Sequence, residues 1–256
     1  MRVVIIGAGN VATVFGRLIA KANHEIIQVV SRKIASAQLL AKELGCAFSN
    51  DPKILDTTAD VYIVAMADAA LNEIHEDYFL GDKLIVHTAG SLSKDILKMV
   101  SINYGVIYPL QSLRKENLEL HQDIPLLIDG NSADILAIIE KFAFTLSSTV
   151  AETNDEQRLK LHVAAVIVSN FTNHLYALAA DYCSKESLDF KMLQPLIEET
   201  ALRLRYHLPR EMQTGPAIRK DIMTLDKHLR VLSHHPELKK VYLRITDSIM
   251  NASPGP

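Results

Sequence analysis

The order of apolar and polar positions in the first part of the chain predicts short strands that alternate with amphipathic helices. Val3–Ile6 is an apolar run typical of a buried strand. After it, apolar residues recur at the spacing of an amphipathic helix, at Val11, Val14, Phe15, Leu18 and Ile19. Further strands are predicted at residues 25–31, 60–66, 83–87 and 104–108, with shorter candidates at 125–129 and 148–152. Helices are predicted at residues 34–44, which Gly45 ends, and at 133–144. This alternation predicts an α/β domain with a mostly parallel sheet.

From about Thr153 onward the pattern changes and no convincing strand follows. One long helix is predicted over residues 155–184. Because it is apolar nearly all round, we expect it to be buried on most sides, in part by packing on a second subunit. Thr214 or Gly215 as a cap, with Pro216 in the first turn, predicts another helix start. Helices are also expected at residues 188–206 and 237–250. We therefore expect two domains, residues 1–152 and 153–256, the second entirely helical.

The turn after the first strand, Gly7-Ala8-Gly9-Asn10-Val11-Ala12, has the spacing of a dinucleotide-binding loop. Gly7 permits the tight turn, Gly9 lets the backbone approach a pyrophosphate, and Ala12 lets the helix pack close to the strand. The amides of the first helical turn, including those of Asn10 and Val11, would hold the phosphate charge. The alternative is a glycine turn in a flavodoxin-like sheet without a nucleotide.

The end of the second predicted strand distinguishes between the two nicotinamide dinucleotides. A carboxylate there would accept hydrogen bonds from the 2′-hydroxyl group of NAD(H), whereas this chain has Ser31-Arg32-Lys33. We therefore expect NADP(H), with the basic residues on its 2′-phosphate. The alternative is a pair of basic residues at an exposed helix start. The missing acid also disfavours a methyltransferase, in which a carboxylate commonly holds the ribose.

The composition is that of an ordinary globular protein, with 48% hydrophobic and 22% charged residues. A formal net charge of -3 gives no argument for binding nucleic acid or a membrane surface, and no apolar run approaches the roughly 18 residues of a membrane span. Cys46 and Cys183, with no signal peptide before the first strand, predict reduced thiols in a cytoplasmic protein. His234-His235 has no carboxylate or Cys at ligand spacing, so we expect no metal site.

Several polar residues stand where a substrate would lie, because ligands of parallel sheets bind at the carboxyl ends of the strands. His87, Ser91 and Gln111 follow predicted strands, and Asp68 is expected to cap a helix. On the long helix His162, Ser169, Asn170 and Asn173 form a polar stripe, which either lines a cleft or makes hydrogen bonds between helices. Asp221 and His228 share a helix face as an acid/base pair or as a solvated surface. Thr214, Gly215 and Arg219 form a positive helix end suited to an anion.

Together these residues resemble a bacterial Rossmann-like family of poorly defined function. The family is related to pyrroline-5-carboxylate reductases, deazaflavin-dependent NADP oxidoreductases and the hydroxyacid and 6-phosphogluconate dehydrogenases. The resemblance rests on residues 7–12, 87–90, 108–112, 162–170 and 214–228. It implies an N-terminal NADP domain with Ala65, Met66 and Ala67 beside the cofactor. It also implies an all-helical C-terminal domain like that of 6-phosphogluconate dehydrogenase, a homodimer through those helices, and a cleft between the domains.

The chain departs from this resemblance at three places. Related dehydrogenases have a Lys, with an Asn one turn later, where this chain has His162 and Asn170. Met66-Ala67-Asp68 replaces a Val-Pro-Asp, and Arg219-Lys220-Asp221 replaces an Arg-Gly-Asp. The cofactor assignment is unaffected, whereas the proton-donor arrangement of the relatives does not carry over intact.

The sequence therefore predicts an NADP(H)-dependent oxidoreductase that transfers a hydride between the nicotinamide and a small carbonyl, imine or hydroxy compound. Its candidate acid/base groups are His162, then the Asp221–His228 pair, then His87, because a histidine titrates near neutrality. The alternative is a non-catalytic protein that binds NADP(H) and acts as a sensor or scaffold. A third possibility is reduction of a flavin-like carrier.

Overall fold

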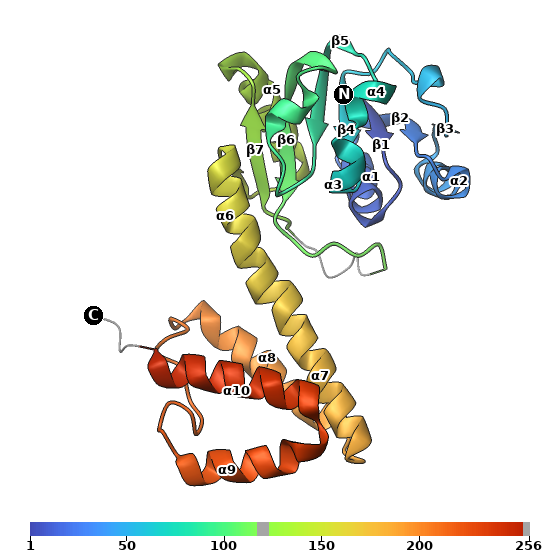
Figure 1. Cartoon of the computed structure of the whole chain (residues 1–256). Coiled ribbons are helices and arrows are strands. Elements are labelled where there is room, and N and C mark those ends of the chain that lie inside the picture. Colours follow the sequence, from blue (N-terminus) through green and yellow to red (C-terminus); the bar gives the residue numbers. More distant parts are fainter. Residues whose placement is uncertain (117–122, 253–256) are drawn as a thin grey trace. The chain divides into compact units, whose positions relative to one another are not determined.

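The computed structural model describes residues 1–116 and 123–252, and its compact units are Met1–Asn170 and Phe171–Pro256 (Figure 1). Each unit is described by itself. All strands of the described residues precede Thr153, whereas the second unit is helical. The predicted fold class, a mostly parallel sheet followed by a helical region, is confirmed. The predicted domain boundary between residues 152 and 153 stays a prediction.

The first unit is built on an eight-stranded sheet with the order β3-β2-β1-β4-β5-β6-β7-β8. Its strands are β1 (Arg2–Ile6), β2 (Glu25–Val30), β3 (Ala47–Ser49), β4 (Val61–Val64), β5 (Gly81–His87), β6 (Ser101–Pro109), β7 (Leu126–Gly130) and β8 (Val150–Glu152). Neighbouring strands are parallel except for β6 and β7. The strand β3 was not predicted, because it is short and two of its three residues are exposed.

Helices cover both faces of this sheet because the central strands are apolar on both sides. One face packs against α1 (Asn10–Lys21), α2 (Ile34–Leu44) and α5 (Ala133–Leu146), which contribute Phe15, Leu40 and Phe142 to the core (Figure 1). The other face packs against the short elements α3 (Asp68–Leu71), α4 (Ile74–Asp77) and η2 (Lys94–Leu97). A further 3-10 turn, η1 (Pro52–Ile54), follows β3. The first unit thus buries its own core.

The predicted long helix is present as α6 (Asp155–Ala165), a π-helical segment η4 (Val166–Phe171) and α7 (Thr172–Lys185). A capping box between Asn154 and Gln157 starts it. In the single chain only Arg158 and Cys183 of these residues are buried, so the expected burial against a second subunit stays a prediction. By length and composition alone this helix, among the described residues, is also apolar enough to cross a membrane.

The second unit adds short helical elements to α7. They are η5 (Phe190–Leu193), α8 (Gln194–Leu202), η6 (Arg203–Arg205), α9 (Ile222–Val231), η7 (Leu232–His234) and α10 (Pro236–Asn251). The helix predicted at 188–206 is thus divided, and the one predicted to end at residue 250 is found. The predicted helix start at Thr214–Pro216 is wrong, because α9 begins after Asp221, whose carboxylate accepts a hydrogen bond from the Thr224 N–H group.

Candidate functional site

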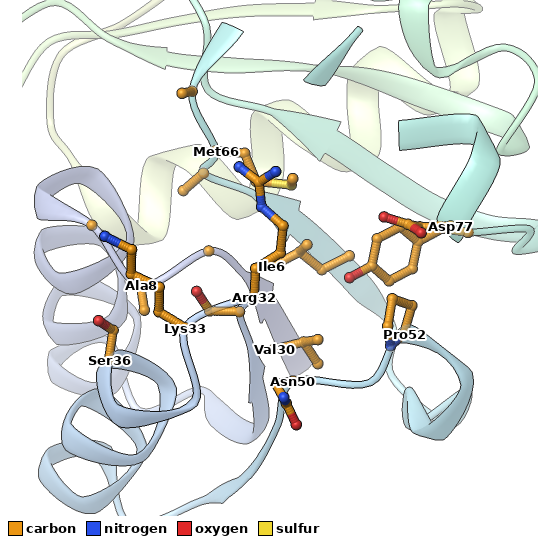
Figure 2. Close-up of a pocket in the computed structure, with 16 residues that line it drawn as sticks. Ile6, Ala8, Val30, Arg32, Lys33, Ser36, Asn50, Pro52, Met66 and Asp77 are labelled. Atoms are coloured by element: carbon orange, nitrogen blue, oxygen red, sulfur yellow. The ribbon is translucent and has the colours of Figure 1, made fainter. Parts of the chain in front are cut away.

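A pocket of about 660 Å³ lies at the carboxyl ends of β1, β2 and β4 (Figure 2). The sheet order places β2 and β4 on opposite sides of β1, so the chain leaves β1 at the topological switch point where α/β proteins bind nucleotides. The predicted cofactor-binding residues that line this pocket are Gly7, Gly9, Ser31, Arg32, Lys33, Ala65, Met66 and Ala67. We call it the nucleotide pocket.

The two glycines of the turn have different roles. Gly7 has φ +127°, and a Cβ atom there would lie 2.1 Å from the carbonyl oxygen of Ala65, so only glycine fits between the ends of β1 and β4. A Cβ atom at Gly9 would meet no atom of the described residues within 4 Å. Gly9 therefore leaves open space in front of the first turn of α1, where the amides have no side-chain cap from the described residues. This open, amide-lined space fits a pyrophosphate.

Arg32 and Lys33 line the same pocket from the end of β2 (Figure 2). Within the described residues Arg32 makes no ion pair, so its guanidinium group is available to a ligand phosphate. Asn10, Val11 and Ala12 do not line the pocket; Ala12 is fully buried and packs in the core, as its small size predicts. Their backbone amides remain the groups expected to face phosphate.

The nucleotide pocket also includes residues that the sequence analysis missed. Ser36 enters from the first turn of α2, Asn50 follows β3, and Tyr78 follows α4. Asn50 could have been found only by recognising β3, whose residues lack a buried alternation. The pocket is thus lined both by residues that follow β2 and β3 and by residues that follow β4, on the two sides of the switch point.

A second pocket, of about 470 Å³, lies where β6 ends beside α6 and η4. Four predicted residues meet in it, namely Gln111, His162, Ser169 and Asn170. Three residues of the polar stripe, His162, Ser169 and Asn170, thus line a hollow of the first unit, and their role toward a substrate stays a prediction. Tyr108 and Ser112 join them, and none of the described lining residues is Asp, Glu, Lys or Arg. We call it the β6 pocket.

A hydrogen bond of 2.9 Å joins the Tyr108 Oη and His162 Nδ1 atoms in the β6 pocket. The rings meet edge to face with their centroids 5.8 Å apart. A Cβ atom at Gly90 would lie 2.8 Å from His162 Nδ1 and from Tyr108 Cζ, so the loop after β5 packs directly on the pair. Burial raises the pKa of Tyr108. Tyr108 belongs to a stretch that carried the family resemblance, but no role was predicted for its side chain.

His87 lies outside both pockets and is fully buried at the end of β5. Its Nδ1 atom accepts a hydrogen bond of 3.1 Å from the Ala89 N–H group, and its Nε2 atom lies 3.3 Å from the Ser93 carbonyl oxygen. Burial, assisted by the charge of Arg158, lowers the pKa of His87 to about 4. His87 therefore holds the backbone of the loop after β5 through these two contacts, as a neutral imidazole.

A buried arginine holds the same loop from the other side. The Arg158 side chain is 1% exposed, and its Nη2 atom donates to the Leu92 carbonyl oxygen at 2.6 Å and to Asp155 at 2.5 Å. Asp155 also accepts hydrogen bonds from Ser93 Oγ and from the Lys94 N–H group. The network ties the loop after β5 to the first turn of α6, and so fixes Gly90 against the Tyr108–His162 pair.

Other predicted residues lie elsewhere. Ser91 donates a hydrogen bond to Asp68, which is the first residue of α3 and not its cap. In the second unit Asp221 accepts hydrogen bonds from Thr224, whereas His228 Nδ1 pairs with Tyr242 Oη at 2.8 Å. The predicted Asp221–His228 pair is therefore not formed. Asn173, Thr214, Gly215 and Arg219 also belong to the second unit, and their substrate role stays a prediction.

Comparison with known proteins finds two matching families and several similar structures. Residues 2–90 match the family described as NADP oxidoreductase coenzyme F420-dependent, and residues 124–249 match a domain of unknown function, DUF2520. A crystal structure of a "putative NADP oxidoreductase" from Bacteroides fragilis is 36% identical, covers 98% of both chains and has a TM-score of 0.92.

More distant structures share the fold. The 1-pyrroline-5-carboxylate reductase of Streptococcus pyogenes is 13% identical, with a TM-score of 0.65 over 98% of this chain and 99% of that one. The imine reductase of Myxococcus stipitatus, solved in complex with NADP+, is 14% identical, with a TM-score of 0.64 over 98% of this chain and 92% of that one. None of the curated proteins matches the chain by sequence.

Proposed function

We propose, from the premise that the chain belongs to the Rossmann-type NADP oxidoreductases, that it transfers a hydride between NADP(H) and a small carbonyl, imine or hydroxy compound. Membership of the family makes it an NADP-dependent oxidoreductase in general terms. The observation that carries the cofactor assignment is the nucleotide pocket, with open space at Gly9 and basic residues at the end of β2.

Different residues of the nucleotide pocket would bind different parts of the cofactor. The first-turn amides of α1 would hold the pyrophosphate, and Arg32 and Lys33 would hold the 2′-phosphate. When bound, NADPH supplies the hydride, so the protein has to supply position and a proton. Ala65–Ala67 extend the pocket along the end of β4, toward the strand ends of β5 and β6.

The β6 pocket is the proposed substrate-binding hollow of the first unit. It stands at the same carboxyl edge of the sheet as the nucleotide pocket, because β6 runs parallel to β5 and β5 to β4. Gln111, Ser169 and Asn170 offer hydrogen bonds that would orient a small polar group, and His162 is the group proposed from the sequence to exchange a proton.

We also propose that two copies of the chain associate through their helices. The described side chains of α6, η4, α7 and α8 include many exposed apolar residues, among them Val168 (72%), Phe171 (59%) and Leu196 (59%). Exposed apolar surface of this extent is typical of an interface. A second copy would cover the same surface that meets the length and hydropathy criteria of a membrane helix.

Binding of both dinucleotides tests the proposed function. We expect NADPH to bind roughly 10- to 100-fold more tightly than NADH, because charge-assisted hydrogen bonds from Arg32 contribute about 1.5–3 kcal/mol. The Arg32→Ala variant should lose this preference, and Lys42→Ala, on the exposed side of α2, should keep it. Fluorescence titration measures the six Kd values, for two dinucleotides and three proteins. Equal affinities in the unaltered protein would contradict the NADP(H) assignment, and no binding would contradict the proposed function.

A further inference from the structure

The proposed function leaves one group in the β6 pocket without a task. Tyr108 Oη is bonded to His162 Nδ1 at 2.9 Å, and both side chains line the pocket. A phenol bonded to an imidazole is a pair that can pass a proton in either direction, because each atom is both a donor and an acceptor over its titration. Tyr108 comes from β6 and His162 from α6, so the contact is made only by the fold.

The described residues that line the β6 pocket around the pair are uncharged. The other polar groups that line the β6 pocket are the amides of Gln111 and Asn170 and the hydroxyls of Ser112 and Ser169. Burying an ion without a partner is costly, so a pocket of this lining favours a neutral polar group with apolar neighbours. The remaining described lining is Leu, Ala and Val. A ketone or aldehyde group matches both properties.

We propose that Tyr108 donates the proton in the reduction of an uncharged ketone or aldehyde, and that His162 restores it. The inference rests on the proposed hydride transfer and names the substrate class and the donor for it. As a hydride adds to the carbonyl carbon, the C=O π electrons move to oxygen and the Tyr108 Oη–H bond breaks to protonate that oxygen. The products are an alcohol, NADP+ and a phenolate.

The phenolate is then neutralised by its neighbour. The proton on His162 Nδ1, present when the imidazole is charged, moves to Tyr108 Oη, and the neutral imidazole takes a proton from water. The net change is one carbonyl, one NADPH and one proton converted to one alcohol and one NADP+. Tyr108 carries its proton near neutral pH, because a phenol ordinarily titrates near 10 and burial raises the pKa of Tyr108 further. Gly90 leaves the space that the pair occupies.

Activity assays with matched variants test the donor. The substrates are a set of small uncharged ketones and aldehydes and a set of cyclic imines, each followed by loss of NADPH absorbance. Tyr108→Phe should lower kcat for the carbonyls by about 10²- to 10⁴-fold, the usual contribution of a general acid. Tyr104→Phe, on the same strand but bonded to Asp95, should keep the wild-type kcat. The Kd for NADPH, measured separately, should be the same in all three proteins.

A spectroscopic readout examines the pair without turnover. Nitrogen-15 NMR of the histidine rings distinguishes the protonated from the unprotonated ring nitrogen, and the spectrum of His162→Gln assigns the His162 signals. Tyr108→Phe should shift both His162 ring signals, because the partner that fixes the tautomer is gone. Tyr104→Phe should shift neither. Unchanged His162 signals in Tyr108→Phe would overturn the inference.

The activity outcomes separate the inference from the proposed function. Carbonyl reduction that survives in full in Tyr108→Phe would overturn the donor assignment while leaving the oxidoreductase in place. Reduction of imines alone by the wild-type protein would overturn the substrate class and would also leave the oxidoreductase in place. A wild-type protein that binds NADPH and reduces neither set would contradict the proposed function, and the inference with it.

Discussion

The two units of the chain use apolar residues in opposite ways. In the first unit, Ile5, Ile63 and Val86 are 0% exposed in strands that helices cover on both faces. In the second unit the large apolar side chains are mostly at the surface, with Met192 at 79% and Leu208 at 66%. The described apolar residues buried there are Cys183, Ala217, Leu225 and Leu232.

This difference shows which part of the fold is complete in one chain. Burial of apolar surface is the main favourable contribution to folding, so the first unit contains the source of its own stability. The second unit exposes residues that would contribute only when covered. The proposed binding sites also differ between the units, since both the nucleotide pocket and the β6 pocket belong to the first unit. We therefore propose that the first unit carries the chemistry and that the second carries the association.

Placing a charge on the exposed apolar face should have the largest effect. Phe171→Glu would put one carboxylate from each copy into the proposed interface, and burying an ion costs several kcal/mol. We expect dimerisation to weaken by more than about 5 kcal/mol, or over about 10³-fold in Kd. Sedimentation equilibrium measures this. Lys185→Gln, at the solvated end of α7, is the control and should stay dimeric.

A monomeric wild-type protein would show instead that the apolar surface of the second unit is not an interface. A Phe171→Glu protein that remained dimeric would move the interface away from the middle of the long helix. Either result would contradict the proposed difference between the units, in which the first buries its own core and the second associates with another copy through its helices.

Removing the buried arginine should have the next largest effect, this time on the first unit. Arg158→Met leaves the Leu92 carbonyl oxygen and part of Asp155 without a partner, and breaking a buried ion pair costs about 3–5 kcal/mol. We expect the lower part of this range, because the Asp155 side chain is 36% exposed and still accepts hydrogen bonds from Ser93 Oγ and the Lys94 N–H group. Urea unfolding measures the loss in free energy of unfolding.

The neighbouring residue Lys160 provides the matched control for Arg158. It pairs with Glu156 on the same helix, but both side chains are more than 70% exposed, at 72% and 75%. An exposed pair contributes about 0–1 kcal/mol, so Lys160→Met should leave the unfolding midpoint nearly unchanged. Equal losses in the two variants would mean that the network around the β5 loop adds no stability to the first unit.

The sequence predicted the nucleotide pocket well because its signals are local. The β1 turn, the start of α1 and the basic end of β2 each lie within a few residues, and backbone geometry requires glycine at position 7. The helix predicted to start at Thr214 failed because Asp221 offers a stronger cap to α9, with its side chain on Thr224. The π-helical segment η4 had no signal in the apolar pattern, whereas the apolar residues all round the long helix agree with its exposure in a single chain.

The β6 pocket could be predicted only in part, because its central contact is not local. Gln111, His162, Ser169 and Asn170 were found by residue type and position. The bond between Tyr108 and His162 joins residues 54 positions apart, so it depends on how β6 and α6 pack. The Asp221–His228 spacing suggested a pair, but each residue found a different partner once α9 and α10 were in place. Helical spacing brings residues to one face without choosing their hydrogen bonds.

Lowering the pH should have the smallest of the three effects, and it should destabilise the first unit through protonation of His87. Burial lowers the pKa of His87 from 6.5 to about 4, with Arg158 opposing protonation and Asp155 and Asp68 favouring it. Above pH 6.5 both the folded and unfolded states are neutral at His87, and its contribution is complete. As the pH falls toward 4 only the unfolded state takes the proton, so stability is lost, by up to about 3 kcal/mol.

Urea midpoints at about pH 7.5 and about pH 4.5 measure this loss, and His87→Gln should flatten the difference between them. His75→Gln, with the histidine exposed on α4, is the control and should keep the wild-type difference. Carboxylates with lowered pKa values, such as Asp56, lose their contribution below their ordinary value of 3.8 and so act outside this range. If His87→Gln kept the full pH dependence, the acid sensitivity would belong to another group, and the loop after β5 would not depend on a neutral imidazole.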